Sequence, residues 1–425
     1  PQWYLYYKND MKFTRDGKRL WLGLKPMSEH FSPEKYEIKF NDTTIANLDS
    51  IQSKSSLLLW GYKDPEIMTQ QKNDWEMTRD KLYKAIYNLD SKKLVPLSDD
   101  TVSTVVFTNN PYFTIGYDET PYKVESTWEY SKFDLYKIYL NNGSRELITK
   151  ELQEPASISP NGKFTAFYKD SNWYAYDNFQ DTTRHLNKQM PKLAFYDEDW
   201  DQPDKAPSYG MLGWYDQGDF ILLYDKYDIW MVICKDPEGI ACQTMLYGRD
   251  IRYNMAFRAV EFEKDREYFT KNDTLILNGF RYKEKYNSLY CQDFRVLGPG
   301  TVFKEQPYNF FIKAKAKYNN SAIITKEKFD VFPDLYYIID FFKKSDTLVK
   351  LTNFNSQLSN YYWGTSELVH WVNSKGDSLT GFIMKPENYD PNKRYPVIIH
   401  FYERFSDMVN QFQRPQINHR PNPLI

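Results

Sequence analysis

The sequence predicts a mainly β fold in which short antiparallel sheets repeat along the chain, as in a β-propeller, before a second domain begins near the C-terminus. Two recurring motifs and the composition lead to this prediction. Aromatic residues make up 18% of the 425 residues, with 36 Tyr and 28 Phe, and such side chains pack well on pleated sheets. The 17 Gly and 22 Pro are too few for a collagen-like or disordered chain.

The first motif is an apolar residue followed by an aromatic one inside a strand-like segment. It recurs at irregular intervals of roughly 40 to 60 residues, close to the length of a propeller blade with loop insertions. Its six copies are Leu82-Tyr83, Leu135-Tyr136, Trp173-Tyr174, Ile229-Trp230, Leu289-Tyr290 and Leu335-Tyr336. Three copies continue through a polar turn into another apolar strand, at residues 82–98, 135–149 and 335–352. We therefore expect hairpins that belong to successive blades.

The second motif is a tight turn between two strands, with Ser or Thr, then Asp or Asn, Gly and Lys. It occurs in FTRDGKRLWLG (13–23) and in ISPNGKFTAFYKDSNWYAYD (158–177), and a variant with Asp-Gln-Gly-Asp occurs in residues 212–232. The Asp/Asn-Gly pair supplies the positive φ that a tight hairpin requires, and the alternation after it is typical of a half-buried strand. Three such hairpins, each followed by an aromatic strand, favour blades.

The rest of the chain has weaker patterns. Residues 64–84 fit either a short helix or a long loop, and both remain open. Residues 191–208 are acidic and contain proline, which indicates an irregular connection between blades. The blade pattern stops near Thr352, so we predict a propeller over residues 1–360, with its N-terminal part missing, and the start of another domain over 361–425.

The last domain is expected to open with a strand pair and one further strand. ELVHWVN and LTGFIMK are predicted to form a hairpin, and a loop with Pro386 and Asp390-Pro391 leads to the apolar run VIIHF (397–401). We predict that this run is a buried strand that ends in an aromatic-polar turn.

Composition excludes several classes of function. The net charge is −2 with acids and bases interspersed, which gives no general field for a polyanion, so nucleic-acid binding is not expected. No run approaches the ~20 apolar residues of a membrane-spanning helix. The chain begins at Pro1 without a basic-then-apolar leader, so we expect the N-terminus to have been processed or cropped, and export remains open.

The three cysteines give no strong signal. Cys234 and Cys242 flank a turn-rich segment that would suit a cross-strand pair, and two strand thiols are the equally good alternative. The histidines at 30, 185, 370, 400 and 419 show no ligand spacing near the cysteines, so a zinc site is not expected.

Residues 361–407 lead to a family resemblance. The supporting strings are WGTSELVHW (363–371), GFIMKPENYDP (381–391), KRYPVIIHFYERFSD (393–407), FPDLYY (332–337) and LLYDKYDIW (222–230). With these strings the chain resembles the prolyl-oligopeptidase family of serine peptidases, in particular a bacterial, envelope-type branch that includes dipeptidyl-peptidase-like enzymes. The resemblance is strong from Tyr361 onward and weak in the blades.

The resemblance implies a propeller of seven or eight blades in the intact protein, followed by an α/β-hydrolase domain that carries a Ser-Asp-His triad. It implies a propeller-gated peptidase for short peptides that needs no cofactor, located in the bacterial periplasm or cell envelope, and it is compatible with a homodimer. The serine of such a triad lies in a G-x-S-x-G turn. This chain contains no such string, so the triad is expected beyond Ile425 and the chain alone is not expected to be active.

Tyr402 is the one catalytic position that the resemblance carries over to this sequence. It lies six residues after Tyr395-Pro396, where the family's tyrosine donates its hydroxyl to the oxyanion of the tetrahedral intermediate. The alternative is an aromatic residue that packs at the end of a strand. Glu403 and Arg404 replace the small residues common after this tyrosine. The two interpretations are a reshaped oxyanion loop and a pairing of the two charges at the domain interface, and we favour the interface.

Other candidate residues favour structural interpretations. Gly376-Asp377-Ser378-Leu379 spells the signature of another esterase family, but it lies in a predicted hairpin turn. His370, His400 and His419 have no serine and acid at a defined spacing. A loop around Glu198 resembles the acidic motif of family exopeptidases only superficially, and a solvated loop is favoured. For Arg258, a contact with a carboxylate in the central cavity and a salt bridge within the blades remain equally good.

Two other functions remain open. The first is a non-catalytic propeller that binds a partner or acts as a scaffold in the envelope. The second is an esterase or acylaminoacyl hydrolase on the same architecture.

Overall fold

The computed structural model describes most of the chain. The described residues are 3–27, 61–78, 80–235, 241–244, 246–250, 254–263, 265–296, 301–304, 307–342, 348–401 and 404–414. The chain divides into two compact units: unit 1 comprises Pro1–Lys188 with Cys234–Gly239, and unit 2 comprises Gln189–Ile233 with Ile240–Ile425. The domain boundary predicted between residues 360 and 361 stays a prediction.

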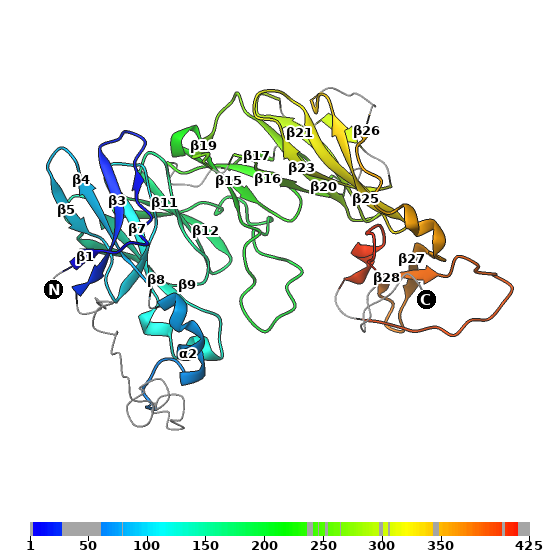
Figure 1. The fold of residues 1–425 in the computed structure, drawn as a ribbon, viewed down its shortest axis with the longest axis horizontal. Helices are drawn as coiled ribbons and strands as arrows, with labels where there is room; N and C mark the ends of the chain where they lie inside the picture. Colours follow the sequence, from blue (N-terminus) through cyan, green and yellow to red (C-terminus); the bar gives the residue numbers. More distant parts are fainter. Residues whose placement is uncertain are drawn as a thin grey trace, which may run out of the picture. The chain divides into compact units, whose positions relative to one another are not determined.

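Unit 1 contains three antiparallel sheets (Figure 1). The first consists of β1 (Trp3–Leu5), β2 (Lys12–Phe13), β3 (Arg19–Pro26), β4 (Tyr83–Asn88) and β5 (Lys93–Pro96). The second consists of β6 (Val102–Val105), β7 (Phe113–Asp118), β8 (Phe133–Tyr139) and β9 (Arg145–Leu152). The third consists of β10 (Ser157–Ile158), β11 (Phe164–Lys169), β12 (Asn172–Asp177) and β13 (Thr182–His185).

Unit 2 contains three larger sheets and one hairpin. The first sheet consists of β14 (Met211–Tyr215), β15 (Phe220–Tyr224), β16 (Ile229–Ile233) and β17 (Ala241–Thr244), and β19 (Tyr268–Phe269) pairs with β14 in parallel. The second consists of β18 (Met255–Ala259), β20 (Thr274–Arg281), β21 (Tyr286–Asp293) and β22 (Thr301–Lys304). The third consists of β23 (Asn309–Lys315), β24 (Ala322–Lys328), β25 (Val331–Ile338) and β26 (Val349–Lys350). The hairpin consists of β27 (Thr365–Val372) and β28 (Ser378–Lys385).

Helices are few among the described residues. The helix α2 (Met68–Thr78) settles the open question about residues 64–84 in favour of a helix. The short 3₁₀ helices are η3 (Thr120–Tyr122), η4 (Glu125–Thr127), η5 (Asp216–Gly218), η6 (Ser356–Asn360) and η7 (Phe405–Met408). None of these helices is long and apolar enough to span a membrane. The prediction of a mainly β fold is confirmed, whereas the number of blades and the hydrolase domain stay predictions.

The six aromatic motifs occupy equivalent positions in the six larger sheets. Each lies on or directly before the third strand of its sheet, namely β4, β8, β12, β16, β21 and β25. This strand is hydrogen-bonded on both edges. The first motif residue is buried in four copies, and the aromatic second residue is half-buried in all copies except that of Tyr290. The repeat seen in the sequence therefore corresponds to a structural repeat of one sheet per copy.

The Asp/Asn-Gly turns connect consecutive antiparallel strands, β2 to β3 in the first sheet and β10 to β11 in the third, as predicted. Ser159 Oγ accepts a hydrogen bond from Phe164 N (2.9 Å), and Asn161 Oδ1 accepts one from Lys163 N (3.0 Å), while Gly162 has a φ of +73°. A side chain at Gly162 would also come within 2.7 Å of the Asn110 side chain. Glycine is therefore required both by the conformation and by the close approach of the neighbouring turn.

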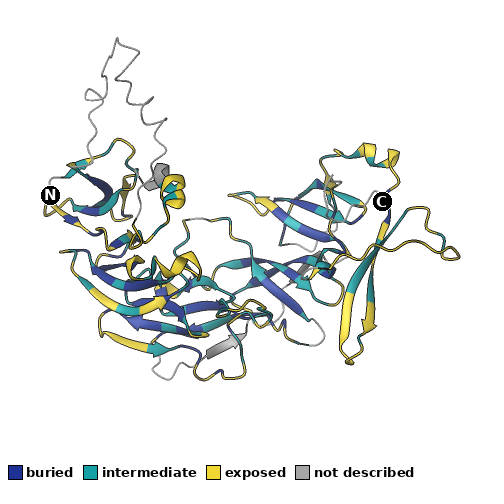
Figure 2. Ribbon diagram, turned by 90° about the horizontal axis from the view of Figure 1, so that it is seen from below, coloured by how far each residue is buried: buried dark blue, intermediate teal, exposed yellow. Residues whose placement is uncertain are grey.

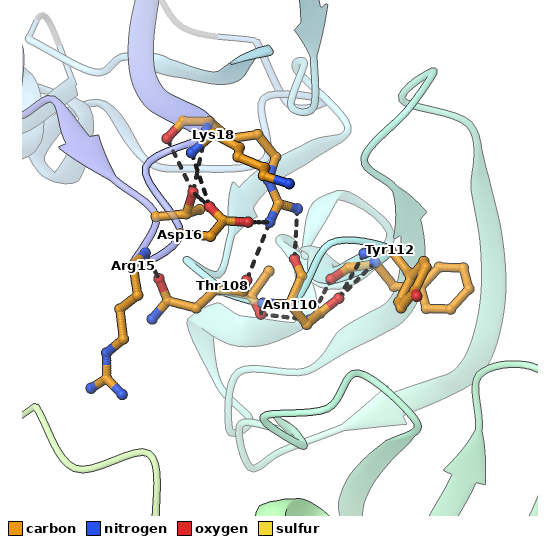
Figure 3. A network of polar contacts seen from close by, with 10 residues as sticks. Arg15, Asp16, Lys18, Thr108, Asn110 and Tyr112 are labelled. Atoms are coloured by element: carbon orange, nitrogen blue, oxygen red, sulfur yellow. Dashed lines mark hydrogen bonds and ion pairs between the residues drawn. The ribbon is translucent and has the colours of Figure 1, made fainter. Parts of the chain in front are cut away.

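The corresponding turn in the first sheet contacts the next sheet directly. Asp16 Oδ1 accepts a hydrogen bond from Thr14 Oγ1 (2.5 Å) and Asp16 Oδ2 pairs with Arg19 Nη2 (2.9 Å). Arg19 Nη1 also donates to the carbonyl of Asn110 (3.0 Å). Figure 3 shows the polar network that includes Asp16 and Asn110. The buried guanidinium thus joins two successive sheets through charged and neutral acceptors.

The apolar core lies between successive sheets. One cluster joins the β1–β5 and β6–β9 sheets, around Ile86 and Ile138, and another joins the β6–β9 and β10–β13 sheets. In unit 2, Phe257 belongs to the cluster between the first and second sheets, and Ile324 to the cluster between the second and third. Figure 2 shows these strand interiors as dark blue, buried segments. Sheets that cover one another in sequence order are the packing expected of blades.

A fully buried lysine also connects two sheets of unit 1. Lys137 Nζ lies 2.5 Å from Asp181 Oδ1 and 2.7 Å from Glu146 Oε2, and its ammonium lies over the rings of Tyr139 (4.9 Å) and Tyr176 (5.6 Å). Burial acts to lower the pKa of Lys137, but the carboxylate partners outweigh it and raise the pKa above its usual value. Lys137 therefore links β8 to the turn after β12 through an ion pair.

In this 425-residue chain the predicted buried strand VIIHF is not a strand, and for this chain the prediction is wrong. Residues 397–401 pair with no other strand in the described part of the chain, and Figure 1 draws the chain after β28 as a loop. Val397 is 71% exposed, Ile398 83%, Ile399 79% and Phe401 87%. An apolar run forms a buried strand only where neighbouring strands and covering side chains exist. The hairpin β27–β28 is a separate two-stranded sheet, so it supplies neither a neighbouring strand nor covering side chains for this run.

Two smaller predictions have clear outcomes. Residues 191–208 form an irregular segment with a single isolated bridge between Tyr196 and Ser208, as expected for a connection. Of the two open alternatives for Cys234 and Cys242, the register of β16 and β17 disfavours a facing pair, because it places Cys242 opposite Met231.

Candidate functional site

The predicted catalytic residue Tyr402 lies outside the described residues, as do Glu403 and His419. Its described neighbours in sequence are Phe401, which is exposed, and Arg404, which begins the segment that contains η7. We call residues 404–412 the anchor segment. Its contacts show what holds the chain from Arg404 onward.

Arg404 forms the first contact of the anchor segment. Its Nη1 lies 2.9 Å from Asp199 Oδ2 and its Nη2 lies 2.8 Å from Asp199 Oδ1, which is a two-point ion pair across 205 residues of sequence. Lys226 Nζ approaches the same carboxylate at 2.7 Å. The Arg404 guanidinium, together with Lys226, lowers the pKa of Asp199 to about 2. Asp199 therefore stays charged and holds both cations.

The turn between β20 and β21 forms the second contact. Lys285 Nζ lies 2.7 Å from Asp407 Oδ1, and Asn410 Nδ2 donates to the carbonyls of Glu284 (2.9 Å) and Lys285 (2.8 Å). Asn309 Nδ2, at the start of β23, donates in turn to the carbonyl of Asn410 (3.0 Å). Because Asn410 is buried, these bonds satisfy groups that water does not reach.

The third contact is apolar and involves the hairpin. The rings of Phe412 and Trp363 stack with centroids 5.0 Å apart and planes 7° apart, and Phe332 of β25 meets Phe412 edge-on at 5.3 Å. Trp363 Nε1 donates to the carbonyl of Phe329 (3.0 Å), and Ser366 Oγ donates to the carbonyl of Val409 (2.6 Å). The anchor segment therefore contacts the connection at Asp199, the turn between β20 and β21, the strands β23 and β25, and the hairpin.

An aromatic group lies beside the charged contacts. The ring of Tyr282 lies 5.6 Å from that of Tyr227 and 5.5 Å from that of Phe280, and the ammonium groups of Lys226 and Lys285 lie 5.8 and 5.9 Å from it. Burial raises the pKa of Tyr282 to about 12, so its hydroxyl stays protonated at neutral pH. The aromatic rings give both lysine side chains an apolar surface, and the ring faces attract their ammonium charges.

A second buried carboxylate orders the loop that presents Lys226. Asp225 is fully buried, accepts hydrogen bonds from Tyr227 N (2.7 Å) and Asp228 N (2.6 Å), and pairs with Arg249 Nη2 (2.9 Å). Arg258 donates to the carbonyl of Asp225 (3.0 Å) and lies over the Tyr224 ring (4.8 Å). Arg258 thus binds backbone carbonyls, which differs from both alternatives considered from the sequence.

The other candidates from the sequence have structural roles. His370 Nδ1 lies 3.1 Å from Thr380 Oγ1 across the hairpin, and His400 packs against Phe405. Ser378 begins β28 after a turn in which Asn373 Oδ1 accepts from Asp377 N (2.9 Å). A serine that starts an exposed strand is not on the strand-to-helix turn of a nucleophile. Glu198 is exposed, as expected for a solvated loop.

The arrangement can bind and orient a segment of chain, and its groups are charge partners, amide donors and rings. No group of three or more His, Cys, Asp or Glu side chains suited to a metal ion occurs among the residues that the structure describes. Arg404 pairs with a charge, as the sequence suggested, but its partner Asp199 was not predicted, and the pairing of Glu403 and the domain interface stay predictions. The acidic string YDEDWDQP (196–203) was the only sequence feature that pointed to this partner, because no local pattern links residues 205 positions apart.

Comparisons with known proteins give distant structural similarity only. No protein-family model matches the chain, and no curated protein matches its sequence. The chain is similar to a structure from a study of two prolyl endopeptidases, with a TM-score of 0.42 and 9% identity over 92% of this chain and 47% of that chain. It is also similar to the acylaminoacyl peptidase of Pyrococcus horikoshii, with a TM-score of 0.35 and 11% identity over 88% and 50%. The chain spans about half the length of both proteins.

Proposed function

We propose that this chain is the propeller and the start of the catalytic domain of a serine peptidase of the prolyl-oligopeptidase type. The supporting observation is the order of its parts. Six blade-like sheets precede the hairpin β27–β28, and the hairpin precedes an exposed apolar run that ends at Tyr402. In the proposed protein this run is a strand of the α/β sheet, and its neighbours and the triad follow Ile425.

The proposed reaction is acyl transfer from a short peptide. The serine hydroxyl attacks the peptide carbonyl while histidine takes its proton, and the resulting tetrahedral oxyanion accepts hydrogen bonds from Tyr402 and a backbone amide. Histidine then returns the proton to the leaving amine, and water releases the acyl group by the reverse sequence. Loss of one oxyanion donor costs roughly 10²- to 10³-fold in kcat, which sets the size of the Tyr402 contribution.

The anchor segment gives this proposal a structural basis. An oxyanion donor acts only if it is already oriented when charge develops. The anchor segment, residues 404–412, is held by Asp199, Lys285 and the Trp363–Phe412 stack, on three different parts of unit 2. The blades of the proposed enzyme would therefore contribute to orienting the catalytic strand as well as to gating short peptides.

The test is labelling of the intact protein with a fluorophosphonate, followed by mass spectrometry of the labelled peptide. We expect one labelled serine in a G-x-S-x-G context beyond Ile425, and hydrolysis of short peptides in preference to simple esters. Tyr402→Phe should lower kcat with little change in KM. Absence of labelling would favour the scaffold, and faster hydrolysis of esters or acylated amino acids than of peptides would favour the esterase or acylaminoacyl hydrolase.

A further inference from the structure

We propose that Arg258 and Tyr282 form a binding site for the carboxylate group of a small ligand, at the edge of the second sheet of unit 2. The inference goes beyond the proposed function and does not depend on it, because it concerns binding without turnover. Arg258 lies on β18, the strand at one edge of this sheet, and Tyr282 directly follows β20, the strand with which β18 pairs. Both side chains are half-buried.

The guanidinium of Arg258 contacts no carboxylate among the residues that the structure describes. Its Nη1 donates to the carbonyl of Phe257 (2.8 Å), and its Nη2 donates to the carbonyls of Asp225 (3.0 Å) and Lys226 (3.5 Å). Three other arginines of the same unit each pair with a carboxylate, namely Arg249, Arg266 and Arg404. A half-buried charge without a counter-ion is costly, so a ligand that supplies the missing negative charge would bind favourably.

The same guanidinium is held in a fixed orientation. Its central carbon lies 4.8 Å from the ring centre of Tyr224 and 5.6 Å from that of Tyr209. The bonds to backbone carbonyls use the two terminal nitrogens, so the Nε–H of Arg258 has no acceptor within the described part of the chain. A guanidinium that is already oriented loses little conformational freedom when a planar carboxylate binds it.

The loop at residues 225–227 brings Tyr282 next to this guanidinium. Arg258 binds carbonyls of the loop, while Lys226 Nζ lies 5.8 Å from the Tyr282 ring centre and the Tyr227 ring lies 5.6 Å from it. Burial raises the pKa of Tyr282 to about 12, and Arg258 has the largest opposing effect. The hydroxyl therefore stays protonated at neutral pH, and it makes no hydrogen bond with the residues described. It is free to donate to a carboxylate bound at Arg258.

The neighbouring charges favour a ligand with one negative charge. Lys226 and Arg404 share the carboxylate of Asp199, so these three groups carry one positive charge in excess. The buried carboxylate of Asp225 belongs to the loop that Arg258 contacts, and it would repel a second negative charge on a ligand. A carboxylate is therefore a better match than a phosphate dianion, and the flanking tyrosine rings favour an apolar group beside it.

The test is isothermal titration calorimetry of the intact protein with phenylpropionate and with phenylpropionamide. The two probes have nearly the same shape, and only the first is charged. We expect phenylpropionate to bind at least about 10-fold more tightly, because charge-assisted hydrogen bonds are stronger than neutral ones. Inorganic phosphate, at the same pH and ionic strength, should bind more weakly than phenylpropionate.

Two variants and one control assign the site. Arg258→Gln removes the charge and should weaken phenylpropionate binding at least about 10-fold. Tyr282→Phe keeps the ring and removes only the hydroxyl, so binding should weaken about 3- to 10-fold. The matched control is Arg145→Gln, since Arg145 pairs with Asp99 (2.8 Å) in unit 1. Its affinity for phenylpropionate should stay within about twofold of that of the unchanged protein.

Several results would overturn the site. Equal affinities for phenylpropionate and phenylpropionamide, or no binding of either, would do so. An affinity for phenylpropionate that Tyr282→Phe leaves unchanged would remove Tyr282 from the site, and tighter binding of phosphate would contradict a carboxylate ligand. If Arg258→Gln does not fold, Tyr282→Phe and the pair of probes still decide. Because turnover is not measured, failure of the proposed peptidase activity leaves this test unchanged.

Discussion

Two stretches of unit 2 have nearly the same local sequence and opposite environments. Residues 322–325 read AIIT and form the start of β24, whereas residues 397–400 read VIIH and lie in no strand. Ile324 is fully buried between strands β23 and β25, and Ile399 is 79% exposed. The comparison teaches that an apolar β-branched run has the capacity to form a strand, while its partners decide whether it does.

The partners of β24 are identifiable. β24 pairs with β23 through six residue pairs and with β25 through six more. Ile324 packs in the same cluster as Leu289 and Ile276 of the preceding sheet. The run at 397–401 has the loop after β28 on one side and the anchor segment on the other, and neither supplies a strand.

The largest expected effect uses the same substitution at both isoleucines. Ile324→Ala should lower the free energy of unfolding by about 2–5 kcal/mol, because it removes buried methyl groups and leaves a cavity. Ile399→Ala should change it by less than about 0.5 kcal/mol in the 425-residue chain, because the side chain is already solvated. Chemical denaturation measures both values. Similar losses at the two positions would show that residues 397–401 are packed in solution.

The next effect concerns the end of the anchor segment. Phe412→Ala should cost about 2–4 kcal/mol locally, because a stacked and mostly buried ring is lost. The loss should appear as faster amide exchange around Trp363 and in β27, with exchange in β11 of unit 1 unchanged as the internal control. Uniformly faster exchange in both units would contradict a local anchoring role.

The third comparison is between a buried lysine, Lys137, and an exposed one, Lys393. Lys137→Met should reduce the free energy of unfolding by about 1–3 kcal/mol, because two hydrogen-bonded carboxylates lose their partner and the ring contacts lose their charge. Lys393→Met is the matched control, since Lys393 is 71% exposed and lies 3.9 Å from Asp390. Equal changes in the thermal midpoint for both variants would show that Lys137 does not link the two sheets.

The smallest effect is the dependence of stability on pH. Asp99 and Asp199 have folded-state pKa values of about 2 against an ordinary 3.8, because Arg145 and Arg404 respectively bind them. A carboxyl with a lowered pKa stabilises the fold above its unfolded value, and this contribution is lost as pH falls through the interval toward 2. The thermal midpoint should therefore decrease between pH 4 and pH 2, and less so in the Asp99→Asn, Asp199→Asn double variant. A midpoint that rises on acidification would contradict these pKa directions.

Much of the fold could be predicted from local patterns. The six aromatic motifs lie at the third strand of their sheets, and the Asp/Asn-Gly turns are where the positive φ of Gly162 was expected. These features depend on neighbours within about ten residues, so they can be predicted from one sequence. The hairpin β27–β28 was predicted for the same reason.

The failures have one physical cause. The run at 397–401, the facing of Cys234 and Cys242, and the partner of Arg404 all depend on contacts that local sequence does not specify. Strand pairing needs a neighbour, the register of β16 and β17 places Cys242 opposite Met231, and Asp199 is 205 residues from Arg404. The role of Tyr402 stays a prediction, since the residue lies outside the described part of the chain.

The central proposal is that residues 397–401 become a strand of the α/β sheet in the intact protein. Amide hydrogen exchange measures this directly at Val397–Phe401, in the 425-residue chain and in the intact protein. We predict exchange close to the unstructured rate in the 425-residue chain, and protection of at least about 100-fold in the intact protein once the strand has partners on both edges. Fast exchange in both, or protection already present in the 425-residue chain, would contradict the account.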